Sequence, residues 1–471
     1  MRLHFKTLLA AIFLSGNLVC NFIYAQSEMT LAAFDNLYQS SYLNPAFTSD
    51  HKVSLGLPGI SSIYFGVGNS GFSFNELTLG AGSNQIKLNA LAGIAGKNNL
   101  LYQKLGVDIF HLRYKKGNAY LSFHIIHKQQ FYWSYPADFL DFASGNFFNP
   151  DYSGKTFDLS NLKASFFHYN EYAFAYNKPA TWQDKSFIYG FRFKFLQGLS
   201  NMLLSPADMK IQTGKSGEAI TSNQDFVVHT SGIFSENELN KFGIQGNYFT
   251  NFKNPGLAFD AGIAVPLNKK LTVAAGLTNI GFIYWTNNTR DLNMPLKEIF
   301  NGVNASNLLL TRDFNTISLS DTIKQQFLPF ISSRGSYVAW LIPGLNLNVK
   351  YSLGKKWNFQ LTGFFEKYKV VRSSIALTGQ LKLNRVLSLA GSASFTFNQF
   401  NTGLGLVLKP GPFQFYLLCD NLFTTYYTDP EGKIPVPLPL DSRNINIRTG
   451  INIVWGAQRN QQRLSGRRNY D

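Results

Sequence analysis

Residues 357–368 read WNFQLTGFFEKY and carry the pattern that decides the fold. Two sets of side chains alternate along this stretch: Trp357, Phe359, Leu361, Gly363 and Phe365 in one set, and Asn358, Gln360, Thr362 and Glu366 in the other. Successive side chains of a β-strand point to opposite faces, so this spacing predicts a strand with one apolar and one polar face.

The same alternation recurs at residues 374–383, 387–398 and 444–455. A soluble β-sandwich would alternate too, so strand length must separate the two classes. Residues 119–133 and 271–285 exceed the usual five or six residues of globular strands and reach the ~9–11 that a tilted membrane strand needs. Aromatic residues near strand ends are expected to form interfacial girdles: Tyr132, Trp133, Tyr284, Trp285, Trp340, Trp357, Tyr368 and Trp455.

The connections between the expected strands fall into two groups. Short ones, each with a basic residue, lie at 115–118, 177–185, 268–270, 353–356, 384–385 and 409–412, and the longest lie at 134–161, 286–335 and 421–442. Counting back from the last strand places the two groups at opposite ends, as in outer-membrane barrels. We therefore predict an all-β, antiparallel transmembrane barrel over residues 53–455. It would have 14 to 16 strands, the first between 53 and 79, and a hairpin near 214–217 could belong to a loop.

Residues 1–25 have the features of a secretory signal peptide. Arg2 and Lys6 precede an apolar core, and cleavage is expected between Ala25 and Gln26. Cys20 could indicate a lipid anchor, but Val19 stands where a small residue is preferred. After residue 25 no apolar run approaches the ~20 residues of a membrane-spanning helix. An exported chain of this kind is expected in the cell outer membrane.

Composition narrows the function further. Charged residues make up 15% of the chain, below the roughly 25% of soluble domains, and aromatic residues make up another 15%. The net charge of +16 would suit nucleic acid, but export argues against that partner. Basic residues in turns and in the tail, residues 456–471, fit contact with anionic outer-membrane lipid, and the tail is expected to be disordered in the periplasm.

No motif predicts catalysis, a cofactor or a metal. Gly66, Gly68 and Gly71 match G-x-G-x-x-G, but residues 72–74 look like another strand, so a tight turn explains the glycines better. His124 and His127 fall on opposite faces of one strand and cannot share a ligand. The remaining candidates stand apart in the sequence: His111, His168, His229, Asp108, Glu171 and Glu366. Cys419 is the one mature cysteine, which excludes an internal disulfide. We predict that the chain is not an enzyme, although a barrel enzyme stays a weaker alternative.

Asn44, Pro45 and Ala46 lie just before the first expected strand. This Asn-Pro-Ala resembles the N-terminal signature of the long-chain fatty-acid porin (FadL-like) superfamily and of Bacteroidota barrels of the PorV and PorP/SprF kind. Residues 55–64 and 69–73 resemble an uncharacterised (DUF-type) Bacteroidota outer-membrane family. The resemblance implies that residues 26–52 form a hatch or plug in the lumen, while a simple turn at Asn-Pro-Ala is the alternative.

Two functions follow from the resemblance. The first is binding or passage of hydrophobic small molecules. The second is an accessory or scaffold barrel that docks a surface, periplasmic or secretion-system protein through aromatic and proline-rich segments at 147–152 and 434–440. The sequence leaves open the ligand, the partner, the oligomeric state and whether the lumen is plugged.

Overall fold

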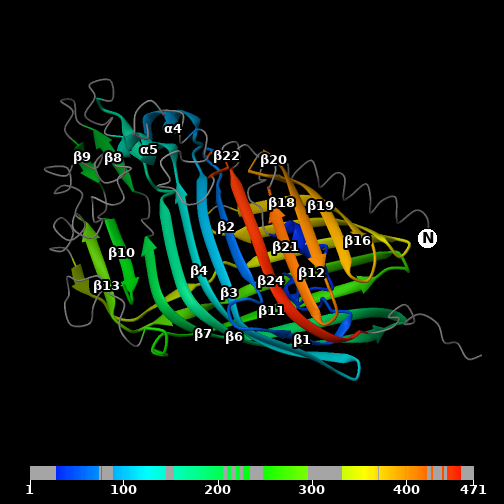
Figure 1. Cartoon of the computed structure of the whole chain (residues 1–471). Coiled ribbons are helices and arrows are strands. Elements are labelled where there is room, and N and C mark those ends of the chain that lie inside the picture. Colours follow the sequence, from blue (N-terminus) through cyan, green and yellow to red (C-terminus); the bar gives the residue numbers. More distant parts are fainter. Residues whose placement is uncertain are drawn as a thin grey trace, which may run out of the picture.

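The computed structural model describes residues 28–73, 76, 88–144, 153–204, 209–213, 219–222, 226–233, 248–294, 331–369, 371–397, 399–421, 426–427, 438–439 and 443–457. Within these residues, fourteen antiparallel strands form a closed barrel (Figure 1). The fold class expected from the alternation is therefore confirmed, at the lower end of the expected strand number.

The wall contains two strands that are each built from two pieces. β1 (His51–Gly56) continues as β2 (Ile63–Asn69), and β15 (Tyr337–Trp340) continues as β16 (Gly344–Leu353). The other twelve are β3 (Asn99–Lys116), β4 (Ala119–Tyr135), β6 (Lys163–Trp182), β7 (Lys185–Leu204), β11 (Pro255–Pro266), β12 (Leu271–Trp285), β17 (Trp357–Lys367), β18 (Val371–Lys382), β19 (Leu387–Thr396), β20 (Gln399–Leu408), β21 (Phe413–Asp420) and β24 (Asn444–Ala457).

The last strand closes the barrel by pairing on both sides. Ile453 of β24 lies opposite Phe413 of β21 and opposite Leu55 of β1, and β2 extends the pairing with β24 further up. Closure satisfies the backbone N–H and C=O groups of the wall from within, which a hydrocarbon environment requires.

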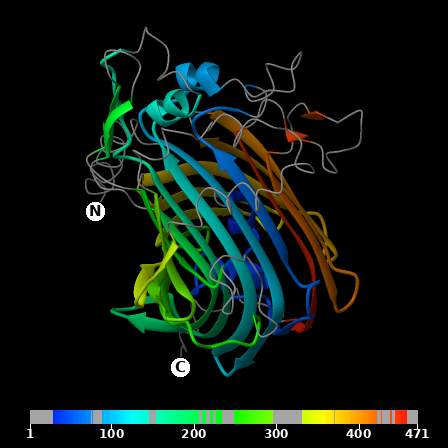
Figure 2. The same ribbon diagram turned by 90° about the vertical axis from the view of Figure 1, so that its left-hand side faces the viewer.

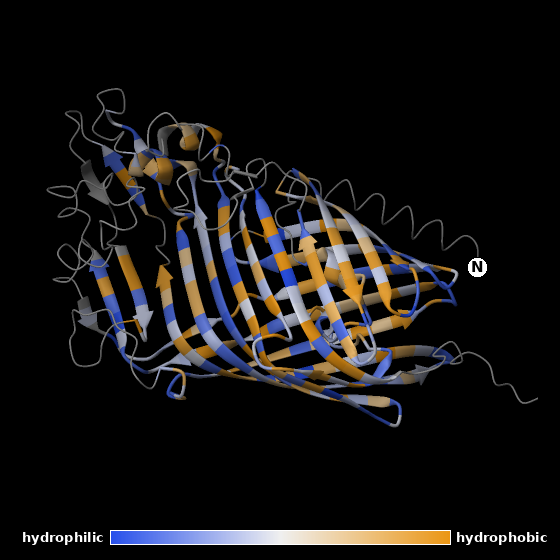
Figure 3. Cartoon of the chain, in the orientation of Figure 1, coloured by the Kyte–Doolittle hydropathy of each residue, from blue (hydrophilic) through white to orange (hydrophobic). Residues whose placement is uncertain are grey.

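The outer face of the wall is apolar and the inner face is polar (Figure 3). On β17, Leu361 is 43% exposed, while Gln360 and Thr362 on either side are buried in the barrel. A soluble protein would place the leucine inside. This inverted polarity is the arrangement of a membrane β-barrel.

The two ends of the barrel differ as the connections predict. One end, called here the short-turn end, carries the hairpin turns, including Gln183 and Asp184, whose positive φ angles (46° and 62°) are those of a two-residue hairpin turn. Opposite it, at the long-connection end (Figures 1 and 2), lie α4 (Leu88–Ile94), α5 (Ala137–Ala143) and a small sheet of β5 (Thr156–Asp158), β8 (Lys210–Thr213) and β9 (Ala219–Ser222).

Further strands extend or accompany this end. β10 (Phe226–Ser231), β13 (Thr289–Met294) and β14 (Ile331–Ser333) prolong the wall above β7, and β22 (Tyr426–Tyr427) pairs with β23 (Leu438–Pro439). The strands on either side of the expected hairpin near 214–217 are β8, which pairs with β5, and β9, which pairs with β8. This sheet lies outside the wall, so that hairpin does belong to a loop.

The girdle prediction was partly wrong. Trp340, Trp357, Trp455 and Tyr284 do face outward and are exposed. In contrast, Tyr132 and Trp285 are buried inside the barrel, and the Tyr368 hydroxyl hydrogen-bonds Ser165. The reason is the two-residue period, because only one of two adjacent aromatic residues can face the outside.

The interpretation of the glycine motif was also wrong. Gly66 and Gly68 lie within β2 instead of in a turn, and the rings of Tyr64 and Tyr102 pack over them. Strand glycines commonly mark such close approaches. Phe72, expected in a strand, packs instead with the apolar cluster at the long-connection end.

Helices contribute little to this fold. None of the helices in the described parts of the chain has the length and apolar character needed to cross a bilayer.

A charged side chain on the outer face should destabilise the barrel more at the middle of the bilayer than near its edge. Leu377 projects outward from the middle of β18 and is 56% exposed, whereas Leu383 projects from a turn at the short-turn end. Leu377→Arg should lower the free energy of unfolding from lipid vesicles by ~2–4 kcal/mol, and Leu383→Arg by ~0–1 kcal/mol. Equilibrium denaturant titration in vesicles measures both. Equal losses would contradict a bilayer centred on β18.

Candidate functional site

The described residues before the first wall strand lie inside the barrel (Figures 1 and 2). This N-terminal segment, residues 28–50, contains α2 (Met29–Ala32) and the 3₁₀ helix η1 (Tyr38–Tyr42). Most of its side chains are buried, including Phe34, Leu37, Tyr38 and Asn44. The lumen is therefore occupied by the protein's own chain.

The first part of the N-terminal segment covers an apolar strip of the inner wall. Leu31, Phe34 and Leu37 pack there. The strip consists of Ala390, Val407, Tyr416 and Leu418, from three neighbouring strands. Beside it, the carboxylate of Asp420 accepts hydrogen bonds of 3.2 Å from the backbone N–H groups of Met29 and Thr30. These N–H groups begin a helix and have no partner within it, so the wall supplies the cap.

The second part, η1, inserts tyrosine rings among polar wall residues. Tyr38 stacks on the His111 imidazole, with ring centroids 3.9 Å apart, and its hydroxyl lies 3.1 Å from His124 Nδ1. The Arg113 guanidinium lies 4.8 Å from the centre of the same ring. Such a cation–π contact is strongest away from water.

The third part, the Asn-Pro-Ala turn, sits on a row of small residues. Gly190, Gly262 and Gly276 are direct register partners on three adjacent strands, β7, β11 and β12. Methyl groups at these positions would overlap Pro45, Asn44 and the Leu43 carbonyl oxygen, respectively. Glycine is therefore required by the close approach of the turn to the wall.

Two asparagines end this row and complete the seat. The Asn177 amide, opposite Gly190, donates 3.0 Å to the Pro45 carbonyl oxygen, and the Asn346 amide, opposite Gly276, donates 3.2 Å to the Leu43 carbonyl oxygen. Asn44 itself donates to the backbone carbonyl oxygens of Ile263 and Ala275, at 3.3 and 3.0 Å. We call Asn177, Gly190, Gly262, Gly276 and Asn346 the Asn-Gly seat.

Side chains hold the N-terminal segment in place. Across the described residues, no strand ladder and no backbone-to-backbone hydrogen bond joins the segment to the wall. Its links include Arg192 to the Ser41 carbonyl oxygen at 2.7 Å and Tyr42 to Asp108 at 2.7 Å. Individual hydrogen bonds of this kind contribute about 0.5–1.5 kcal/mol each, or ~1.5–3 kcal/mol to a charged group. None of the backbone pairings that close the barrel therefore depends on this segment.

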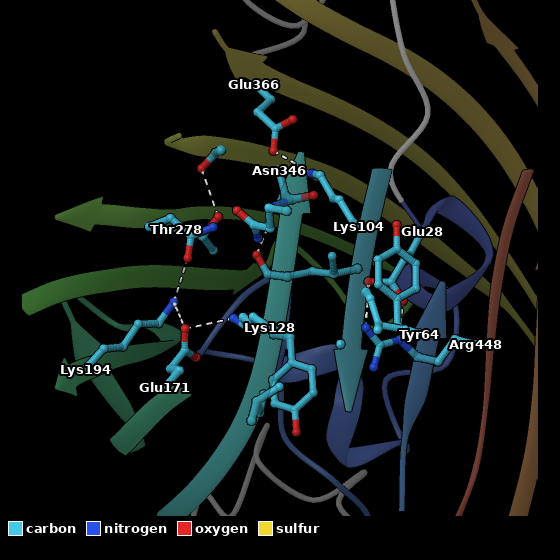
Figure 4. A pocket seen from close by; sticks show the side chains of 18 of the residues that line it. Glu28, Tyr64, Lys104, Lys128, Glu171, Lys194, Thr278, Asn346, Glu366 and Arg448 are labelled. Carbon is cyan, nitrogen blue, oxygen red and sulfur yellow. Dashed lines mark hydrogen bonds and ion pairs between the residues drawn. The ribbon is translucent and has the colours of Figure 1, made fainter. Parts of the chain in front are cut away.

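Beside the N-terminal segment the lumen contains a cavity of about 120 Å³ (Figure 4). Its wall carries five basic side chains, Lys104, Lys128, Arg192, Lys194 and Arg448, and four acidic ones, Glu28, Asp108, Glu171 and Glu366. Glu28 belongs to the N-terminal segment and pairs with Arg448. Apolar residues such as Leu105 and Phe364 fill part of the lining.

Most of the charges around the cavity pair with one another. Glu171 lies 2.7 Å from Lys128 and 3.5 Å from Lys194 (Figure 4), and Glu366 lies 2.8 Å from Lys104. Behind them Asp260 receives Lys194 at 2.8 Å and Arg192 at 2.9 Å. A buried ion that loses its partner is destabilised by several kcal/mol. A ligand that displaced one member of such a pair would therefore need to carry the same charge as the side chain it displaced.

The sequence candidates are thus brought together in part. Asp108, Glu171 and Glu366, far apart in the chain, line one cavity. His124 and His127 lie on opposite faces, as predicted: His124 contacts Glu171 inside, and His127 contacts His168 outside. His111 packs on Tyr38. His229 pairs with Asp291 in the wall extension.

Other site residues were missed by the sequence analysis. Arg192, Lys194 and Asp260 are fully buried charges, and charged residues on the polar side of long alternating strands were the signal that could have found them. No cluster of three or more metal-ligating side chains occurs among the residues with a described placement. Cys419 is buried and free. Ala25 and Gln26 lie outside the described residues, as does nearly all of the tail.

The sequence matches the model of a family of unknown function, DUF5723, over residues 45–420. The chain belongs to this family. No curated protein sequence matches it.

Solved barrels resemble the chain at low identity. They include the toluene transporter TbuX of Ralstonia pickettii (TM-score 0.44, 8% identity, 89% of this chain and 95% of that one) and a FadL homologue of Pseudomonas aeruginosa (0.40, 9%, 93% and 97%). The toluene transporter TodX of Pseudomonas putida follows (0.37, 7%, 88% and 92%). At these scores the likeness adds nothing to the fold described above.

Filling the Asn-Gly seat should displace the N-terminal segment. Gly262→Ala places a methyl group on Asn44 Oδ1, and overpacking of this kind destabilises by about 1–3 kcal/mol. We expect limited proteolysis to cut residues 28–50 faster in the variant, with the barrel intact. Gly391→Ala is the matched control, since nothing lies within 4 Å of a methyl group there. Equal protection of both variants would contradict the seat.

Acid should weaken the docking of the N-terminal segment only at low pH. Burial alone would raise the pKa of Asp35, but the ammonium groups of Lys350 and Lys382 outweigh it and hold that pKa below its ordinary range. A depressed carboxyl pKa stabilises docking above the ordinary value and loses that effect as pH falls below about 4. Proteolysis by an acid-active protease should therefore accelerate below that pH. Asp35→Asn should show no such step, and a step shared by both proteins would refute this assignment.

Proposed function

We propose that this protein is an outer-membrane barrel that passes small amphipathic molecules, with the N-terminal segment as its hatch. The hatch predicted at residues 26–52 corresponds in this proposal to the N-terminal segment, residues 28–50, because His51 and Lys52 belong to β1. Asn44, Pro45 and Ala46 are the point where it seats on the wall. The supporting observation is that side chains alone hold residues 28–50 over an apolar strip and a charged cavity.

The hatch occupies the place that a ligand's apolar part would take. Leu31, Phe34 and Leu37 cover the apolar strip of Ala390, Val407, Tyr416 and Leu418. Displacement of the segment would uncover that strip of the inner wall. An alkyl chain or small ring bound there would bury the strip again, and burial of apolar surface stabilises a complex by roughly 25 cal/mol per Å².

The charged cavity accounts for the other part of the ligand. Five basic and four acidic side chains line it, and Asp260 behind them makes the two kinds of charge equal in number. Displacement of the hatch would take Glu28 away from Arg448, so the open cavity would favour an acidic head group. The expectation of a hydrophobic ligand is thereby narrowed to an amphipathic one, because a pure hydrocarbon would leave desolvated charges without compensation. At about 120 Å³ the cavity is smaller than the ~300–1,000 Å³ of most ligand sites, so passage requires the hatch to move.

A disulfide between hatch and wall should stop transport. The hydroxyl oxygens of Thr30 and Ser392 lie 2.8 Å apart, so cysteines at these positions can meet. In a Cys419→Ala background, oxidised Thr30→Cys/Ser392→Cys should reduce cellular uptake of a fluorescent medium-chain carboxylate to the level of cells lacking the protein. Dithiothreitol should restore it.

A second cysteine pair controls for cross-linking itself. Ser352 and Asn358 face each other across β16 and β17, and Ser352→Cys/Asn358→Cys leaves the hatch free. Uptake through the oxidised control should match the unmodified protein. Equal uptake through the oxidised and reduced hatch-locked protein would exclude a gating role for the segment. Equal uptake of the carboxylate and its neutral ester would exclude selection by the charged cavity.

Several parts of the proposal rest on the sequence alone. Signal cleavage between Ala25 and Gln26, the outer-membrane location and the link to Bacteroidota barrels of the PorV and PorP/SprF kind stay predictions. So does the periplasmic tail at residues 456–471. The alternative of a scaffold barrel depends on residues 147–152 and 434–440, nearly all of which lie outside the described residues. The proposed role is transport without catalysis.

A further inference from the structure

The short-turn end of the barrel is basic. Its six hairpin turns span residues 115–118, 183–185, 267–270, 353–356, 383–386 and 409–412, and each carries lysine or arginine. Asp184 is the one acidic side chain in these turns, all of which the structure describes. The turns themselves therefore carry an excess of positive charge.

Four of the turns repeat one arrangement. Those at 267–270, 353–356, 383–386 and 409–412 join successive pairs of neighbouring strands and form one arc of the rim, which we call the basic arc. An exposed leucine lies in or directly before each of these turns, within two residues of a basic one: Leu267, Leu353, Leu383 and Leu408. The arc is thus apolar on the barrel side and cationic beyond it.

The lysines of two of these turns have no ion pair. Lys269 with Lys270, and Lys355 with Lys356, are exposed, and none of the four forms a salt bridge with another described residue. Trp357 follows the second pair and is 43% exposed on the same edge. Long lysine side chains beside apolar surface lay their stems on that surface and extend the ammonium group toward water.

We propose that the basic arc binds the anionic phospholipid head groups of the periplasmic leaflet. The leucines would enter the acyl layer while the ammonium groups contact phosphate. A soluble acidic protein would offer the negative charge but no acyl layer for the leucines. This inference rests on the proposed outer-membrane location but not on the proposed transport. It gives the barrel a lipid preference and a fixed depth at its short-turn end.

The test uses purified full-length barrel in nanodiscs of mixed phosphatidylglycerol and phosphatidylethanolamine. Mild delipidation followed by native mass spectrometry gives the ratio of anionic to zwitterionic lipid that stays bound. Lys269→Gln, Lys270→Gln, Lys355→Gln and Lys356→Gln together should lower this ratio by about threefold or more, because each lysine near an anionic surface contributes measurably.

A matched variant removes the same charge at the other end. Lys97→Gln, Lys253→Gln, Lys367→Gln and Lys369→Gln replace four exposed lysines of the long-connection end and should leave the ratio unchanged. An unchanged ratio in the first variant, or an equal fall in both, would overturn the proposal. Neither result bears on the hatch, whose failure would show only in the uptake experiment.

Discussion

Pairing of β24 with β1 and β2 is the interaction on which the rest of this structure depends. A sheet open at that seam would expose unpaired backbone groups to hydrocarbon, at several kcal/mol for each group. Once the ladder closes, every wall residue has either an outer or an inner side. Leu361 and Leu377 can then face lipid, while Gln360 and Thr378 are enclosed.

Closure creates a second requirement: the charged and polar side chains of the inner face need ion-pair or hydrogen-bond partners inside the barrel. Glu171, Asp260, Lys128, Lys194 and Arg192 meet this requirement among themselves. The N-terminal segment meets it elsewhere, through Tyr42 on Asp108 and Ser41 on Arg192. The lumen therefore contains two kinds of contact. One is an ion-pair network within the wall, and the other is shared with a segment that forms no backbone-to-backbone hydrogen bond with the described wall.

The Asn-Gly seat shows how closely the segment is fitted. Three register-matched glycines allow the Asn44 turn to approach the strands, and Asn177 and Asn346 bind the carbonyl oxygens on either side. The apolar strip under Leu31 and Phe34 and the charged cavity beside Glu28 lie along the same segment. Its departure would uncover both at once, and the proposal of an amphipathic ligand rests on this arrangement.

Local sequence determined the strands, their two faces and the sorting of short and long connections, because each depends on the two-residue period and on nearby turn residues. The shared face of Phe359 and Leu361 and the opposed faces of His124 and His127 follow from that period alone. Tertiary structure decided which residues of different strands meet, and the two-residue period carries no information about that. Glu171 meets Lys194, and Gly190, Gly262 and Gly276 align, only because strand register joins residues distant in the chain. The same holds for Tyr132 and Trp285, whose inward direction depends on which of two adjacent aromatic residues the closed wall turns toward the lumen.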